Sequence, residues 1–305
     1  MTYSIVARDK DTGELGVAVQ SHYFQVGPIV PWALAGVGAV ATQSRANVAF
    51  GPLGLDLLKA GYSAENALKA LIAGDPLADE RQCAIVDASG AVAVHTGKSC
   101  IPAAGHVVGD GFSCQANLME KETVWDAMAE AFKSSGEPLA ERMMAALDVA
   151  EAEGGDIRGK QSAAMLVVTG NPTGRSWDDR LIDIRVEDSA EPLPDLRRLL
   201  RLRRAYQASS EAAELAESGD LVVAAEKLRL ALELAPEVGE FRFWAGVEMA
   251  RGGALDAGCE MLAEVIRMEG ARWVETLRRL VPVGRISPEL CSAIEARLAA
   301  TTRAK

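Results

Sequence analysis

The chain opens with Met1-Thr-Tyr-Ser-Ile-Val-Ala-Arg-Asp-Lys-Asp-Thr-Gly-Glu-Leu-Gly-Val-Ala-Val-Gln-Ser-His-Tyr-Phe24, a stretch that predicts a β-hairpin. Tyr3 to Arg8 and Leu15 to Ser21 are rich in residues that favour strands. Asp9 to Glu14 supplies the turn residues between them, and Gly13 can take the positive φ that a tight turn requires. The first strand is therefore expected to begin almost at the first residue.

This early start makes Thr2 a candidate nucleophile. An initiator Met that precedes a small residue is normally removed in the cytosol, which would leave Thr2 with a hydroxyl and a free α-amine. The amine has an ordinary pKa of roughly 8, so part of it is unprotonated near neutral pH and can accept the hydroxyl proton. For the dipeptide taken alone, the alternative is an ordinary threonine at the head of a strand.

Composition bounds the class of protein. The chain has 305 residues, of which 49% are hydrophobic and 25% charged, which is typical of a globular protein. Its formal net charge of -11 argues against a nucleic-acid partner, because such binding needs a basic surface. The N-terminus shows no signal-peptide pattern, and prolines and glycines break the longest apolar stretch, residues 26–41. We expect a cytoplasmic protein with no membrane partner.

The sequence offers no pattern for a metal or a cofactor. The five cysteines are an odd number without CxxC spacing, which favours reduced, buried thiols over a disulfide frame or a zinc site. The three histidines are scattered and form no HxxxH pair. Gly36-Val-Gly38 lacks the third glycine of a dinucleotide fingerprint. We therefore expect neither a metal site nor a cofactor. The cysteines are Cys83, Cys100, Cys114, Cys259 and Cys291.

Strand and helix patterns follow each other in blocks over the first 190 residues. This segregation predicts an α+β domain with helices on both faces of two stacked, mainly antiparallel sheets. Ser63 is a plausible N-cap for one of the helices. Further strand patterns cover residues 36–43, 83–95, 104–108, 111–115, 161–169 and 181–186, and helical patterns cover residues 53–72, 122–133 and 139–153.

A second domain is expected over residues 196–305. The proline-punctuated segment 188–194 marks the boundary after a first domain of residues 1–190, and strand patterns vanish beyond it. A helix is expected over residues 196–209, and a 34-residue repeat then aligns residues 219–236 with 253–268. The repeat resembles tetratricopeptide helix pairs, with a capping helix over residues 288–299. Such arrays usually bind peptides or mediate assembly.

Several ordered segments resemble the family known as domain of unknown function 1028. The resemblance covers roughly residues 1–200 and implies an N-terminal-nucleophile (Ntn) hydrolase fold. That fold is the four-layer αββα sandwich of the proteasome β-subunit group, which agrees with the layers expected above. The segments that carry the resemblance are residues 2–9, 15–21, 30–43, 51–58, 111–118 and 159–164.

The resemblance implies a role for Thr2 and its neighbours. Thr2 Oγ would attack an amide or related carbonyl, its α-amine would shuttle the proton, and water would release the acyl product. Ser21 and His22 end the strand that pairs with the first one, so they should lie near Thr2. His22 could hold the amine, or it could be a partly exposed loop histidine. Family members often have Lys where this chain has His22.

Other polar residues complete the candidate site. Gln43 and Asn117 sit at strand ends and could donate hydrogen bonds to an oxyanion, although backbone capping in a turn is the alternative for each. Ser4 shares a strand face with Thr2 by the two-residue period and could line a substrate pocket. Ser113 and Gln115 are candidates for the same pocket.

Two hypotheses compete for the function. The first is a cytoplasmic amidohydrolase that cleaves a small-molecule amide through Thr2, with helices that support a homo-oligomer or a protein partner. The second is a catalytically silent Ntn fold, a binding or scaffold protein in which the helical repeats hold the function. A cell-envelope role, which the C-terminal domains of some family members suggest, is disfavoured by the missing export signal.

Overall fold

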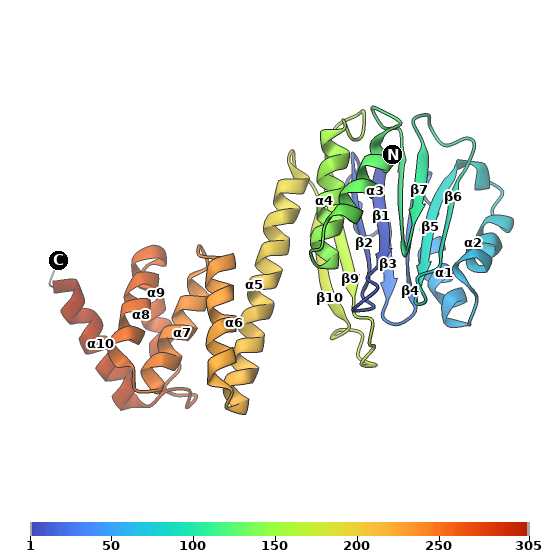
Figure 1. Ribbon diagram of the computed structural model, residues 1–305. Coiled ribbons are helices and arrows are strands. Elements are labelled where there is room, and N and C mark those ends of the chain that lie inside the picture. The colour runs from blue at the N-terminus through green and yellow to red at the C-terminus, as the bar shows by residue number, and fades with distance from the viewer. Residues whose placement is uncertain (1, 304–305) are drawn as a thin grey trace. The chain divides into compact units, whose positions relative to one another are not determined.

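The computed structural model describes residues 2–303 and divides into two compact units. Residues up to Leu200 form the first unit, and residues from Arg201 onward form the second. The described part of the first unit contains both sheets, whereas the described part of the second is helical (Figure 1). The chain is therefore an α+β protein with a helical C-terminal region. None of its described helices is both long enough and apolar enough to cross a membrane.

Two antiparallel sheets form the centre of the first unit. The predicted first hairpin is confirmed, and its first strand lies inside the larger sheet with a partner on each side. The larger sheet has the order β10 (Arg180–Val186), β9 (Ser162–Val168), β2 (Leu15–Ser21), β1 (Thr2–Arg8), β8 (Phe112–Asn117), β7 (Gly105–Gly109). The smaller sheet has the order β3 (Pro31–Leu34), β4 (Gly38–Ser44), β5 (Arg81–Asp87), β6 (Val92–Thr96).

Strand β3 is the one strand of these sheets that the sequence patterns did not predict. It has only four residues and begins at Pro31, which has no N–H to donate to a ladder. Because β3 pairs with β4 alone within its sheet, Pro31 is tolerated at the edge. The short length left too few residues for an alternation to be recognised.

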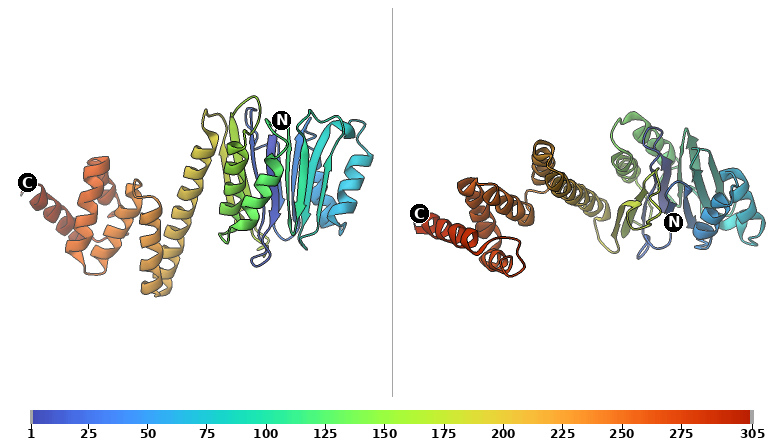
Figure 2. Two further views of the ribbon diagram at one scale, coloured as in Figure 1. Left: turned by 45° about the horizontal axis from the view of Figure 1, so that its top comes forward. Right: turned by 90° about the horizontal axis from the view of Figure 1, so that it is seen from below.

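Helices cover the outer face of each sheet, while the inner faces pack on each other (Figure 2). The outer face of the larger sheet packs against α3 (Val124–Ser134), α4 (Leu139–Ala152) and the start of α5 (Pro192–Ser218). The smaller sheet packs against α1 (Phe50–Lys59) and α2 (Ala64–Ala73), and a short 3₁₀ helix covers Ala78–Glu80. The layers thus run helix, sheet, sheet, helix.

The face between the sheets changes character along the strands. Residues with the same two-residue parity point into this layer. Near one end the layer is apolar and includes Val6, Val17 and Ala41. At the other end the same face carries buried polar side chains: Thr2, Ser4, Gln43, Gln82, Ser113, Gln115 and Asn117. The polar end is where β1 begins.

The second unit begins inside helix α5, at Arg201. Helix α5 (Pro192–Ser218) is longer than the predicted segment 196–209, and its prolines lie in the first turn, where a missing N–H costs little. The boundary between the units falls inside this helix. Helix α5 is followed by α6 (Leu221–Leu234), α7 (Gly239–Arg251), α8 (Leu255–Glu269), α9 (Arg272–Arg279) and α10 (Pro288–Arg303).

Candidate functional site

Thr2 is the first residue of β1 and lies between two strands. Its Cα partners are Ser21 on β2 and Asn117 on β8, so the hairpin and the register of β8 together fix its position. Thr2 is only 4% exposed, and its Oγ1 donates a hydrogen bond of 3.0 Å to Ser21 Oγ. The expected contact between Thr2 and Ser21 is therefore present. Met1, whose removal the nucleophile would need, lies outside the described residues.

Two side-chain amides approach the main chain of Thr2 from different sheets. Gln43 Nε2, on β4, lies 3.3 Å from Thr2 O, and Asn117 Nδ2, on β8, lies 3.4 Å from the same atom. Both amides are buried. The structure thus brings Gln43 and Asn117 to Thr2. Their amides bond the carbonyl oxygen of Thr2 in this structure, whereas the role expected for them was to donate to an oxyanion.

Gln82 connects these two amides and was not predicted as a site residue. Its Oε1 accepts from Gln43 Nε2 and from Asn117 Nδ2, each at 2.8 Å. Its Nε2 faces three acceptors: Thr96 Oγ1 at 2.9 Å, Ala116 O at 2.9 Å and Gly105 O at 3.1 Å. A polar residue directly before the apolar run Cys83-Ala-Ile-Val86 was the sequence signal that could have identified it.

Ser4, Ser113 and Gln115 form a buried hydrogen-bonded chain beside Gln43. Gln115 Nε2 donates to Ser4 Oγ at 2.7 Å, and Ser4 Oγ donates to Gln43 Oε1 at 2.6 Å. Ser113 Oγ donates to Gln115 Oε1 at 2.9 Å. All three residues are fully buried. They lie in the same layer as Thr2, which the sequence predicted for Ser4, and they brace the orientation of Gln43.

His22 lies just beyond β2, and the hydrogen bond described for it comes from its main chain and not from its imidazole. Its backbone N donates to Asp156 Oδ2 at 3.2 Å, while its Nδ1 is buried without a hydrogen-bond partner. No hydrogen bond in residues 2–303 joins His22 to Thr2. The Asp156 side chain is buried and pairs with Arg158 at 2.8 Å. Asp156 therefore fixes the main chain that follows Ser21.

Backbone strain accompanies the two amides that approach Thr2. The residues that directly follow Gln43 and Asn117 are Ser44 at φ 68° and Leu118 at φ 56°. A left-handed conformation is unfavourable for residues other than glycine, and leucine gains no local hydrogen bond from it. Such strain persists only where surrounding contacts hold it, and it is concentrated at functional sites.

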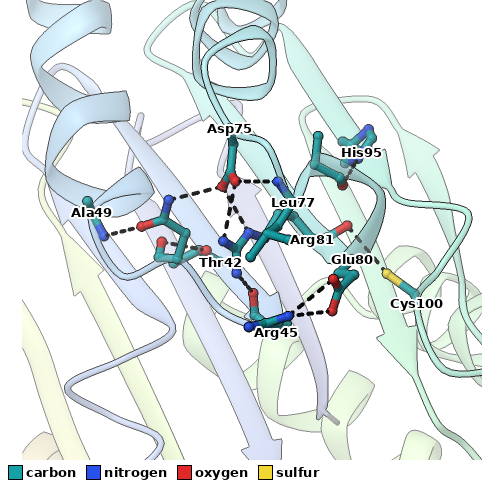
Figure 3. A network of polar contacts seen from close by, with 11 residues as sticks. Thr42, Arg45, Ala49, Asp75, Leu77, Glu80, Arg81, His95 and Cys100 are labelled. Carbon is teal, nitrogen blue, oxygen red and sulfur yellow. Dashed lines mark hydrogen bonds and ion pairs between the residues drawn. The ribbon is translucent and has the colours of Figure 1, made fainter.

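A second polar network surrounds Arg81 on the helix-covered face of β5 (Figure 3). Arg81 Nε pairs with Asp75 Oδ2 at 2.9 Å, and both side chains are almost fully buried. Asp75 also accepts from Leu77 N at 2.8 Å and Asn47 Nδ2 at 3.1 Å, and Arg81 Nη1 donates to Arg45 O. The hydrogen bond from Arg81, despite opposing burial, lowers the pKa of Asp75 to about 2. This network joins the end of α2 to the sheet and has a structural role.

The remaining reactive side chains form no second centre in the described part of the chain. All five cysteines are free and buried, and burial raises the pKa of Cys83 to about 12. Residues 2–303 contain no group of three or more His, Cys, Asp or Glu side chains placed to hold a metal ion. A surface hollow of about 450 Å³ is lined by Asp148, Glu151, Ala152, Lys160, Glu191, Leu193 and Pro194, and thus not by Thr2.

In class this is an α+β protein with two packed antiparallel sheets, a buried amide cluster at the start of its central strand, and a helical C-terminal region. The chain belongs to the family of unknown function DUF1028, which matches residues 2–196. It is similar to the crystal structure of protein SPO2555 from Silicibacter pomeroyi, which carries the same family assignment. The two are 29% identical with a TM-score of 0.60, and the match covers 66% of this chain and 84% of that chain. No curated protein matches the chain.

Proposed function

We propose that this protein is a cytoplasmic amidohydrolase of the Ntn type, in which Thr2 becomes the nucleophile once Met1 is removed. The observation that carries the proposal is the position of Thr2, at the start of a central strand with its Oγ1 bonded to Ser21 Oγ. The layer order helix, sheet, sheet, helix supports an Ntn sandwich.

The proposed reaction follows from the chemistry of an N-terminal threonine. The free α-amine would take the proton of Thr2 Oγ1 as the oxygen attacks the amide carbonyl, and it would then protonate the leaving nitrogen. Water would release the acyl group by the reverse sequence. Gln43 and Asn117, which bond Thr2 O, would be the neutral donors for the oxyanion, which requires their Nε2 and Nδ2 to exchange Thr2 O for the substrate oxygen.

The test is a comparison of Thr2 variants in protein whose N-terminus has been read by mass spectrometry. With Met1 removed, a screen of small amides should identify a hydrolysed substrate, and Thr2→Ala should lower kcat by about 10³-fold or more because the nucleophile is lost. Thr2→Ser keeps the hydroxyl and the amine and should retain measurable turnover. Hydrolysis that persists in Thr2→Ala, or Met1 retained in the native host, would reject Thr2 as the nucleophile.

A second candidate function, assembly through the helical unit, has its own supporting observation. Helices α6 and α8 begin at residues 221 and 255, which reproduces the 34-residue spacing that we compared with tetratricopeptide repeats. Leu221 and Val222, at the start of α6, are 67% and 74% exposed. We propose that this tetratricopeptide-like region binds a second copy or a protein partner. Replacement of both residues by Ser should lower the sedimentation coefficient of the native protein if α6 contributes to a homo-oligomer.

A further inference from the structure

Asn117 Oδ1 is a buried acceptor with no hydrogen-bond donor. Asn117 is fully buried, and its Cα partner across the strand pair is Thr2. The two side chains point into the layer between the sheets, by the alternation that also places Gln115 and Ser4 there. An acceptor without a donor at this position therefore belongs to the immediate surroundings of Thr2.

The contacts of Gln82 determine which end of the Asn117 amide stays unpaired. Two of the three acceptors near Gln82 Nε2 are the backbone carbonyls of Gly105 and Ala116, which can only accept hydrogen bonds. Gln82 must therefore present Oε1 to Asn117, and Asn117 must present Nδ2 to Gln82 at 2.8 Å. Asn117 Oδ1 is therefore the atom without a partner, and because an amide oxygen only accepts, its partner must be a hydrogen-bond donor.

The α-amine of Thr2 is the donor that the chain itself can supply. Thr2 O already accepts hydrogen bonds, and Thr2 Oγ1 donates to Ser21. Removal of residue 1 would convert the Thr2 amide N–H into an amine that carries three hydrogens when protonated. The new hydrogens appear on the residue that lies directly opposite Asn117.

We propose that Asn117, oriented by Gln82, is a positioning residue whose Oδ1 accepts a hydrogen bond from the free α-amine of Thr2. The inference deepens the proposed function, since this bond would direct the remaining amine hydrogens and lone pair relative to Oγ1. A hydrogen bond to the protonated amine also favours the charged form and raises the pKa of that amine.

The experiment measures the pKa of the Thr2 amine and needs no substrate. Full-length protein with residue 1 removed is treated with acetic anhydride across a pH series, and acetylation of the N-terminal peptide is followed by mass spectrometry. In Asn117→Leu, which keeps the volume but not the acceptor, the amine pKa should fall by about one unit. Cys114→Ala, which alters the opposite face of the same strand, should leave it unchanged.

Asn117→Asp should shift the pKa of the Thr2 amine in the opposite direction. It also keeps the inference testable if the leucine variant fails to fold. A carboxylate facing the amine should raise its pKa above that of the unchanged protein. An amine pKa that changes in neither variant, or that falls with Asp, overturns the inference. Shifts in the expected directions without hydrolysis of any amide would support the Asn117 contact and reject the proposed enzyme, so the two failures are distinguishable.

Discussion

Gln20 on β2 carries two of the buried unpaired polar atoms of the first unit. Its side chain is fully buried on the face that packs against helices, where its Cα partners are Tyr3 and Ala163, and neither Nε2 nor Oε1 has a hydrogen-bond partner. An unpaired buried polar group costs about 1–3 kcal/mol of stability. The Gln20 amide therefore lowers the stability of the fold, and only the stem of the side chain contributes favourable packing.

We predict that Gln20→Met increases the free energy of unfolding by about 1–3 kcal/mol, because Met keeps the volume and removes both unpaired groups. Urea denaturation followed by circular dichroism measures the change. Gln115→Met is the matched control, since the amide of Gln115 is bonded at both ends to Ser113 and Ser4. That variant should be less stable than the unchanged protein. A loss of stability in Gln20→Met as well would contradict the prediction.

At the scale of elements, helices α7 and α8 approach each other through two glycines. A Cβ atom placed on Gly258 would lie 2.4 Å from Gly246 O and 2.9 Å from Ala250 N, and one on Gly246 would lie 2.8 Å from Gly258 O. These are backbone atoms, which cannot move aside without separating the helices. Glycine is thus required at both positions of this crossing by backbone contact.

We expect Gly258→Ala to lower the stability of the second unit by about 1–3 kcal/mol, although alanine favours a helix by about 1 kcal/mol over glycine. Thermal unfolding monitored by helical circular dichroism provides the measurement. Gly252→Ala is the control, because φ there is -74° and its nearest neighbour, Glu248 O, would lie 3.4 Å away. Equal effects of the two substitutions would show that backbone contact does not limit the crossing.

At the scale of the whole molecule, the buried Asp75–Arg81 ion pair beside the smaller sheet makes the stability of the protein depend on pH in acid. The pKa of Asp75 is lowered from an ordinary value of 3.8 to about 2, so the unfolded chain binds this proton more readily than the folded one. The stabilisation is complete above about pH 4 and is lost as pH falls toward 2.

Asp75→Asn should therefore lower stability by about 3–5 kcal/mol at pH 7, because it leaves the buried Arg81 charge unpaired. Its stability should also depend less on pH between 4 and 2 than that of the unchanged protein. Chemical denaturation at a series of pH values tests both statements. Asp56→Asn replaces an exposed carboxylate and should have little effect at pH 7. An Asp75 variant that stays as stable as this control would refute the assignment.

Most strands of the first unit could be predicted because their signals are local. The strand-favouring residues in Thr2–Arg8 and Leu15–Ser21, with Gly13 in the turn at φ 74°, specify a hairpin without help from distant residues. Ser63 likewise caps α2 by accepting from Asn66 N, as predicted. Strand β3 was missed because Pro31–Leu34 is too short to show a period.

The candidate site could be predicted only in part, since its contacts come from strands that are far apart in the sequence. Thr2, Ser21 and Asn117 could be grouped because each lies at the end of a strand and hairpin pairing aligns those ends. Gln82 was missed because some of its partners lie on β4 and β6, which flank it in the smaller sheet, and others lie on β8, which meets it only when the two sheets stack. Asp156 reaches His22 from a loop 134 residues away.

By itself, the sequence determined most of the strands and helices and the candidate nucleophile, because strand-favouring residues, caps and turn residues act between near neighbours. Tertiary structure alone decided what each buried amide does. Gln20 and Gln82 both stand in buried strands, yet Gln20 has no hydrogen-bond partner and Gln82 bonds amides from both sheets. The physical reason is that hydrogen bonds act over about 3 Å, so only the stacking of distant strands determines which polar groups meet.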